Sequence, residues 1–388
     1  MIMAVVLVSG VLTGGLFVSA RREAHLEPGR TGSVSGKAGD AGRPPIVSAS
    51  ASPVPSSTRS VISATASPAG TQTRKARRHS GVGVAIPGIR LIYDAPASTD
   101  RKLDRVAAMG AGWLRFDAAW PEIEIERGRF DYSRVDRALN GARARGLRVV
   151  LVLGGTAAWA RPAGADWNHG PTTATARAGF AAFAATTARR YRDRVGAYEI
   201  WNEPNLPGSW APQPDPAAYF ALLRDAYAGI HRADSDAVVL SGGTGGGLTG
   251  IGSVRWYTDL YAAGLSGVSD GVAVHPYPDA LSPADSGEMS RARRVRALMD
   301  AHGDRDKQLW GTETGTATGG EQAASEKDQA ALVVQLHRQW QGIHTTGPLL
   351  YYTLYDFGGA DREDHFGLLR ADGSAKPAYA SLRDVVIG

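Results

Sequence analysis

From residue 81 onward, short apolar segments alternate eight times with longer segments of helical period. Short apolar runs predict buried strands, and an apolar period of about 3.6 residues predicts amphipathic helices. The predicted strands are Val82–Ile86, Trp113–Phe116, Arg148–Leu153, Ala197–Trp201, Ala237–Ser241, Gly271–Val274, Gln308–Gly311 and Leu349–Leu354. The predicted helices are Asp100–Met109, Tyr132–Arg145, Thr173–Arg192, Pro216–Asp234, Ser253–Ala263, Met289–His302, Ser325–His344 and Pro377–Val386. This order predicts an α/β protein with a (β/α)8 or TIM barrel.

An open doubly wound sheet is the structural alternative, but it usually has fewer units and a nucleotide-binding fingerprint after its first strand. This sequence has neither feature. Of the 388 residues, 43 % are hydrophobic and 21 % are charged, which excludes a chain disordered throughout and a multi-span membrane protein. The lack of cysteine excludes a disulfide scaffold, a thiolate nucleophile, a zinc finger and an iron–sulfur site.

The net charge of +5 is unevenly distributed along the chain. Residues 1–80 hold ten Lys and Arg against three acids and so carry +7, which leaves −2 for residues 81–388. A near-neutral body argues against a nucleic-acid groove in the folded part. We therefore expect no nucleic-acid partner.

The first eighty residues differ in composition from the rest. Residues 2–20 are almost all apolar or small and end in Val18-Ser19-Ala20, which predicts a signal peptide or a membrane anchor over 1–20. No basic residue precedes this run, whereas Arg21 and Arg22 follow it, so a retained anchor would favour a cytoplasmic body, and a buried core helix is a further alternative. Thirty of residues 31–70 are Ser, Thr, Pro, Gly or Ala, so we expect a disordered linker over 21–80. The expected location is secreted or anchored at the cell surface.

Two glutamates follow predicted strands of the body. Asn202-Glu203-Pro204 follows the fourth strand, and Glu313 follows the seventh. The catalytic groups of such barrels lie at the carboxyl ends of the strands, and hydrolysis of a glycosidic bond needs two carboxyl groups. Pro204 is expected to end the strand. Strict alternation would point Asn202 and Glu203 to opposite sides, so we expect a bulge there.

These residues resemble the retaining glycoside hydrolases of clan A, most closely family 39 and the cellulase-like hydrolases beside it. The resemblance covers about residues 81–388. Further matching segments are Trp113-Leu114-Arg115-Phe116-Asp117, His275-Pro276-Tyr277, Phe366-Gly367-Leu368-Leu369 and Lys376-Pro377-Ala378-Tyr379. The body is accordingly expected to be the catalytic domain of a glycosidase.

The resemblance implies a role for each matching residue. Glu203 would be the general acid/base and Glu313 the nucleophile, with Asn202 holding the 2-hydroxyl of the sugar. Arg115 and Tyr277 would keep Glu313 ionised, while Glu203 needs a raised pKa. In a retaining enzyme the two carboxyl groups lie about 5–5.5 Å apart.

Aromatic side chains are candidate platforms for sugar rings. Clan members commonly have a tryptophan after the eighth strand, whereas residues 351–357 here contain none, so Tyr352 or Tyr355 is expected to substitute. Other platform candidates, for which packing is an equal alternative, are Trp120, Trp159, Trp167 and Trp210. The polar residues 361–365 are candidates for an outer subsite, and Asp117 for a supporting position.

His275 is expected to donate a hydrogen bond at the rim rather than to bind a metal. No His-Glu-x-x-His or comparable cluster occurs, so neither a metal nor a cofactor is expected. The glycine-rich residues 241–247 lack the ending of a phosphate loop and predict a flexible loop near the cleft.

Together these features predict a monomeric retaining glycoside hydrolase that acts on a polysaccharide or oligosaccharide by double displacement. A transglycosylase with the same residues is one alternative. A carbohydrate-binding barrel without activity is the other.

Overall fold

The computed structural model describes residues 81–246, 249–278 and 287–387. The expected leader over 1–20, with its possible membrane tether, and the expected linker over 21–80 lie outside the described residues. Within the described ranges, no helix combines the length and the apolar character needed to span a bilayer.

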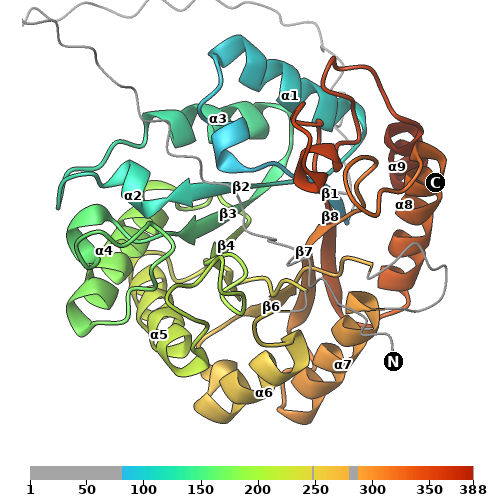
Figure 1. Cartoon of the computed structure of the whole chain (residues 1–388). Coiled ribbons are helices and arrows are strands. Elements are labelled where there is room, and N and C mark those ends of the chain that lie inside the picture. The colour runs from blue at the N-terminus through green and yellow to red at the C-terminus, as the bar shows by residue number, and fades with distance from the viewer. Residues whose placement is uncertain (1–80, 247–248, 279–286, 388) are drawn as a thin grey trace, which may run out of the picture. The chain divides into compact units, whose positions relative to one another are not determined.

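Eight parallel strands form a closed barrel in sequence order, and β8 pairs with β1 to complete it (Figure 1). The strands are β1 (Val82–Ala85), β2 (Trp113–Ala119), β3 (Arg148–Gly154), β4 (Ala197–Ile200), β5 (Val239–Ser241), β6 (Gly271–Val274), β7 (Gln308–Thr314) and β8 (Thr346–Tyr352). The predicted (β/α)8 barrel is confirmed.

Helices surround the barrel and cover the outer faces of the strands (Figure 1). They are α1 (Pro96–Ala108), α2 (Trp120–Ile123), α3 (Ser133–Ala144), α4 (Ala174–Arg190), α5 (Pro216–Ala233), α6 (Ser253–Ala263), α7 (Glu288–Ala301), α8 (Glu326–Gln341) and α9 (Pro377–Ile387). Short 3-10 helices are η1 (Gly88–Arg90), η2 (Ala158–Ala160), η3 (Leu265–Gly267) and η4 (Arg362–His365). Side chains cap the N-termini of several of these helices. Asp215, for example, accepts from the backbone N–H groups of Ala217 and Ala218, and Pro216 occupies the first turn of α5.

Alternation along the strands divides the barrel interior into layers. An apolar layer at the bottom consists of Ala85, Trp113, Val150, Ala197, Leu240, Ala273, Trp310 and Leu350. The rings of Trp113 and Trp310 meet edge to face, with centroids 5.2 Å apart. Side chains two residues further along a strand point to the same side, which places the next layer directly above. That layer is polar and contains Arg115, Glu199, His275 and Thr312.

Several predicted strand limits are wrong, among them the ends of β2, β7 and β8 and the starts of β5 and β8. β7 was expected to end at Gly311 but runs to Thr314, so Glu313 lies within the strand rather than after it. β8 begins at Thr346 rather than Leu349, although Gly347 and Pro348 are poor strand formers. Pairing with a full neighbouring strand outweighs local propensity at these positions.

Candidate active site

The end of β4 turns two consecutive polar residues toward the barrel interior. The strand ends at Ile200, and the next residue, Trp201, has a left-handed φ of 71°. Its ring packs outside the barrel, 5.0 Å from that of Trp210. The inward–outward alternation of side chains is therefore shifted by one residue. Glu203 also has a left-handed φ, of 47°, and as a result both Asn202 and Glu203 face the site.

This geometry corrects two expectations about β4. Its pairing with β3 and β5 contains no register shift, so left-handed residues beyond the strand, rather than a bulge within it, reorient the chain. Pro204 lies beyond the end of the strand and does not terminate it.

An irregularity occurs instead in β7 and brings Glu313 inward. Gly311 of β7 pairs with Leu349 of β8, and Thr314 pairs with Tyr351. The chain therefore advances three residues on β7 while it advances two on β8, which leaves one extra residue on β7. Strict alternation from Trp310 would point Glu313 toward the outer helices. The extra residue turns its carboxylate into the interior.

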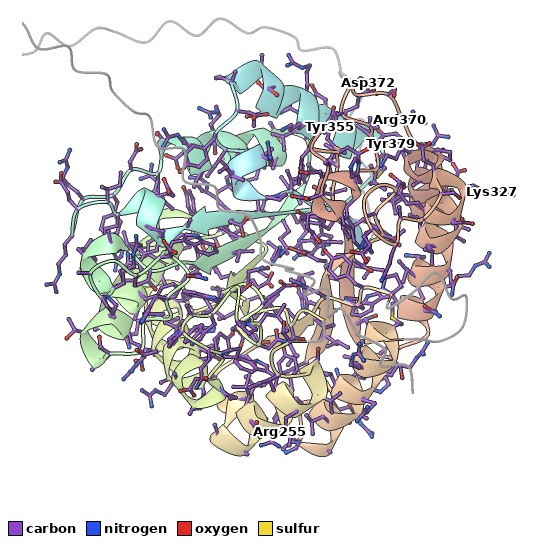
Figure 2. The ribbon with its side chains drawn as sticks, viewed as in Figure 1. Arg255, Lys327, Tyr355, Arg370, Asp372 and Tyr379 are labelled. Carbon is purple, nitrogen blue, oxygen red and sulfur yellow. The ribbon has the colours of Figure 1, made fainter. Side chains whose placement is uncertain are left out.

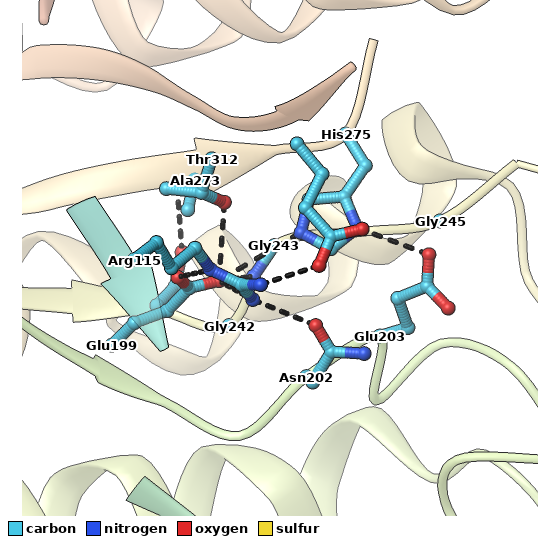
Figure 3. A network of polar contacts seen from close by, with 12 residues as sticks. Arg115, Glu199, Asn202, Glu203, Gly242, Gly243, Gly245, Ala273, His275 and Thr312 are labelled. Carbon is cyan, nitrogen blue, oxygen red and sulfur yellow. Dashed lines mark hydrogen bonds and ion pairs between the residues drawn. The ribbon is translucent and has the colours of Figure 1, made fainter. Parts of the chain in front are cut away.

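Arg115 of β2 connects the two strand ends (Figure 3). Its Nη1 donates to Glu313 Oε1, and its Nη2 donates to Asn202 Oδ1 at 2.7 Å. The Tyr277 hydroxyl donates to the other Glu313 oxygen at 2.7 Å. Arg115 is only 4 % exposed, so these contacts are shielded from water. The structure thus brings together four of the five residues to which the resemblance assigns roles, and the fifth, Glu203, lies beside Glu313.

Glu203 occupies an environment that favours its neutral form. The side chain is buried, with 7 % of the residue exposed, and burial raises the pKa of its carboxyl above the ordinary value. The charge of Glu313 raises it further, whereas His275 and Arg115 act in the opposite direction. One oxygen of Glu203 and one of Glu313 lie within 4.8 Å of each other.

Glu199, which the sequence analysis missed, completes the polar layer. It is fully buried and accepts from Arg115 Nε at 2.7 Å, from Gly243 N at 2.8 Å and from Thr312 Oγ1 at 3.2 Å. Burial alone would raise its pKa, but Arg115 and His275 hold that pKa at about 2. The sequence contains one signal for Glu199. It is a charged residue inside the apolar run 197–201, and it comes two positions after Ala197, so both side chains point into the barrel.

His275 lies at the centre of the site rather than at its rim. It is fully buried, and its Nδ1 is 3.0 Å from Glu203 Oε1. Its Nε2 is 3.9 Å from Glu199 Oε1, an ion-pair distance too long for a hydrogen bond. Burial lowers the pKa of His275, but the carboxylates of Glu313, Glu199 and Glu203 raise it to about 9.

Glu203, His275 and Glu313 are also close enough together to hold a metal ion. However, His275 Nδ1 already lies 3.0 Å from Glu203 Oε1, so these two groups partner each other. Glu313 already accepts hydrogen bonds on both oxygens. The donor set therefore suits an ion-pair network better than a metal.

The glycine-rich segment after β5 is a wall of this site. A Cβ on Gly243 would lie 2.3 Å from His275 Nε2, and one on Gly245 would lie 2.4 Å from Glu203 Oε1. The backbone of Gly243 also accepts from Glu203 N at 2.9 Å. Glycine is required here because the chain passes so close to both side chains. The predicted position of this loop near the cleft agrees with these contacts.

Three of the four predicted tryptophan platforms serve mainly in packing, whereas the fourth, Trp167, is half-buried and stays a candidate. Trp120 and Trp210 are fully buried in the outer core. The Trp159 ring packs edge-on against Trp120, with centroids 5.3 Å apart, and donates to the Glu124 carbonyl at 3.2 Å. Arg127 lies over the same ring at 5.3 Å. The described contacts of Trp159 thus lie with α2 and its loop, not with the carboxyl pair.

The two candidate tyrosines after β8 differ in position. The Tyr355 ring lies 5.9 Å from Lys102 Nζ of α1, and Figure 2 shows Tyr355 near Tyr379 and Asp372. Tyr352, the last residue of β8, instead lies where the charges of Glu313 and Glu203 act on it. The structure therefore favours Tyr352 over Tyr355 as the aromatic residue at the site.

The polar residues after β8 also approach the site. Glu363 of η4 is half-buried, and burial together with the charges of Glu203 and Glu313 raises its pKa to about 7. Asp361 and Asp364, by contrast, cap η4 through reciprocal hydrogen bonds with its backbone. Of this predicted group, Glu363 is therefore the residue whose charge is coupled to the pair.

Comparison with known proteins agrees with this geometry. Residues 78–347 match the model of the cellulase family, glycosyl hydrolase family 5, and no curated protein matches the chain. A family 39 glycoside hydrolase from the gut symbiont Bacteroides cellulosilyticus WH2 has a TM-score of 0.66 and 22 % identity, over 79 % of this chain and 63 % of its own.

Two further solved structures share the barrel. A GH5_18 enzyme from Streptomyces cattleya has a TM-score of 0.62 and 18 % identity, over 80 % of each chain. An exo-β-1,4-mannosidase from Opitutaceae bacterium strain TAV5 has a TM-score of 0.57 and 18 % identity, over 79 % of this chain and 59 % of its own. The expected relation to clan A hydrolases is confirmed: this chain is a glycosidase that belongs to the cellulase family, glycosyl hydrolase family 5.

Proposed function

We propose that the protein is a retaining glycoside hydrolase that cleaves O-glycosidic bonds of a polysaccharide or oligosaccharide by double displacement. The observation that carries the proposal is the proximity of Glu203 and Glu313, whose nearest oxygens lie within 4.8 Å. Retaining enzymes place their carboxyl groups about 5–5.5 Å apart, whereas inverting enzymes need about 6.5–9.5 Å to admit a water.

The reaction then proceeds in two balanced steps. Glu313 attacks the anomeric carbon and forms a glycosyl ester while the bond to the leaving oxygen breaks, and Glu203 donates its proton to that oxygen. In the second step, Glu203 takes a proton from water. The resulting hydroxide attacks the anomeric carbon and releases Glu313 as a carboxylate.

The surroundings of each carboxyl group support these roles. Arg115 and Tyr277 donate to Glu313 and stabilise its charged form. Burial keeps the proton on Glu203, helped by the negative charge of Glu313. That charge disappears when Glu313 becomes an ester, so the pKa of Glu203 falls and the same group becomes a better base.

Two neighbouring residues are proposed to contact the sugar. Arg115 engages Asn202 Oδ1, which leaves the amide N–H groups of Asn202 for the 2-hydroxyl. Tyr352 supplies an aromatic surface beside Glu313. The cellulase family and the structurally similar mannosidase make β-linked hexose chains the first substrates to test. The expected leader and linker support action outside the cytoplasm.

The proposal is tested with Glu313→Gln and Glu203→Gln on aryl β-glycosides and on cello- and manno-oligosaccharides. Each change should lower kcat about a thousand-fold or more. The loss for Glu203→Gln should be larger with oligosaccharides, because an aryl leaving group needs less protonation. Glu126→Gln is the matched control, since Glu126 is an exposed carboxylate paired with Arg129. Wild-type turnover in Glu313→Gln would refute the proposed nucleophile.

A further inference from the structure

Glu199 of β4 is a carboxylate at the active site to which the proposed reaction assigns no step. Its side chain is fully buried, and it lies beside Arg115 of β2 (Figure 3). Arg115 Nε donates to Glu199 Oε2 at 2.7 Å, and Arg115 Nη2 donates to Glu199 Oε1 at 3.2 Å. The remaining nitrogen, Nη1, donates to Glu313. One buried guanidinium therefore pairs with two carboxylates at once.

Further donors hold Glu199 in its ionised form. Gly243 N donates to Glu199 Oε1 at 2.8 Å from the loop after β5, and Thr312 Oγ1 donates to the same oxygen at 3.2 Å from β7. An ionised carboxylate only accepts hydrogen bonds, so each of these contacts favours the charged state. Both oxygens are thus engaged by the protein, and Glu199 has no proton to give. It is a positioning residue, which acts through Arg115 rather than on the sugar.

The proposed reaction removes the charge of one partner of Arg115 and keeps that of the other. When Glu313 attacks the anomeric carbon, a C–O bond forms and the carboxylate becomes a neutral ester. Arg115 is 4 % exposed, so water does not replace the lost partner, and a buried cation without a counter-ion is strongly destabilised. Asp117 also acts on Arg115 by its charge, but its Oδ2 accepts from Gly88 N at 2.9 Å. Glu199 is the carboxylate that stays in direct contact with Arg115.

We propose that Glu199 is the counter-ion that keeps Arg115 paired while Glu313 is an ester, and that it thereby favours formation of the glycosyl-enzyme. The inference rests on the proposed function. In the free enzyme Glu199 also shares the charge of Arg115, so the guanidinium holds Glu313 ionised without suppressing its attack. Glu199 itself exchanges no proton and forms no bond, and the proton on the leaving oxygen still comes from Glu203.

Removing the charge of Glu199 should affect the two steps of the reaction differently. In Glu199→Gln the full attraction of Arg115 acts on Glu313, because an amide does not neutralise a guanidinium. The first step consumes the charge of Glu313 and should slow, whereas the second step regenerates that charge and should not. A residue that served only in folding would affect both steps alike.

Dinitrophenyl 2-deoxy-2-fluoro-β-glucoside and the corresponding mannoside separate the two steps. The fluorine slows both steps and dinitrophenolate leaves readily, so the glycosyl ester accumulates, and its hydrolysis is followed after the excess reagent is removed. In Glu199→Gln the rate of ester formation should fall about a hundred-fold, while the rate of ester hydrolysis should change by less than about threefold. Thermal melting verifies that each variant is folded.

Two further variants make the comparison specific. Glu199→Asp keeps the charge but withdraws it by one methylene from Arg115, so the ratio of its two rates should lie between those of the wild type and Glu199→Gln. It carries the test if Glu199→Gln does not fold. Glu124→Gln is the matched control, because Glu124 is also buried and accepts two hydrogen bonds, from Trp120 Nε1 at 2.6 Å and from Gly128 N at 2.7 Å. It should leave both rates unchanged.

Equal losses in both rates, or no loss in the rate of ester formation, would overturn the role of Glu199. The proposed function fails separately, if mass spectrometry finds no sugar attached to Glu313 of the wild type after treatment with either reagent. A wild-type adduct on Glu313, together with equal losses of both rates in Glu199→Gln, would retain the hydrolase and reject the counter-ion.

Discussion

Among single residues, Arg115 connects most of the active site. Its guanidinium reaches Glu199, Glu313 and Asn202 at once, from a buried position. Such a planar group with five donors can make several directed contacts, whereas an ammonium is a compact charge on a flexible stem. Arg115 therefore sets both the position and the charge of the proposed nucleophile.

Replacing Arg115 with lysine tests this role. Arg115→Lys keeps the charge but loses the forked contacts, so kcat should fall about a hundred-fold, while KM for an aryl glycoside changes less. Arg145→Lys is the matched control, because Arg145 also bridges two carboxylates, those of Asp100 and Asp104, at the surface. Steady-state kinetics measure both variants. Equal kinetics for Arg115→Lys and wild type would show that the directed contacts are dispensable.

At this scale the sequence predicts the site only in part. Asn202, Glu203 and Glu313 stand out because they form a motif at strand ends. Glu199 does not stand out, since an acid in a short apolar run has no partner visible in the sequence. Its partner Arg115 lies 84 residues away, and only the closed barrel brings the two together.

At the scale of elements, the loop after β5 shows how backbone shape serves the site. Gly245→Ala would place a methyl group 2.4 Å from Glu203 Oε1, so the carboxyl group must move. We expect kcat to fall at least about tenfold, because a misplaced acid no longer reaches the leaving oxygen. Gly252→Ala is the control, since its Cβ would meet nothing within 4 Å. Unchanged kcat for Gly245→Ala would mean that Glu203 has room to shift without loss.

The elements also show where sequence patterns stop being informative. Apolar period and helix signals predict all eight strand–helix units, because burial against neighbours governs both. They do not predict the register shift in β7 or the left-handed Trp201. Both features reverse the side on which a residue points, and both depend on neighbours that are distant in sequence.

For the whole molecule, an apolar layer below a charged layer makes stability depend on pH. His275 has its pKa raised from 6.5 to about 9, so its contribution is complete below pH 6.5 and is lost as pH rises through 9. Glu363, with a pKa raised to about 7, already lowers stability as pH rises from 4.5 to 7. Both groups thus lower the free energy of unfolding as pH rises, Glu363 between pH 4.5 and 7 and His275 between pH 6.5 and 9.

Urea unfolding at several pH values measures this dependence. The free energy of unfolding of the wild type should decrease between pH 7 and 9. That of His275→Gln should be lower at pH 7 and should change less over this range, because the substituted residue does not titrate. Parallel curves for the two proteins would show that His275 is not the group responsible.

The most direct test of the central claim is the anomeric configuration of the first product formed, followed by proton NMR during hydrolysis of an aryl β-glycoside. Two carboxyl groups with oxygens within 4.8 Å lie closer together than the roughly 6.5–9.5 Å of inverting enzymes, so the proposed mechanism has Glu313 as the attacking group. The predicted result is a product that appears first with the configuration of the substrate. A first product of inverted configuration would contradict the account.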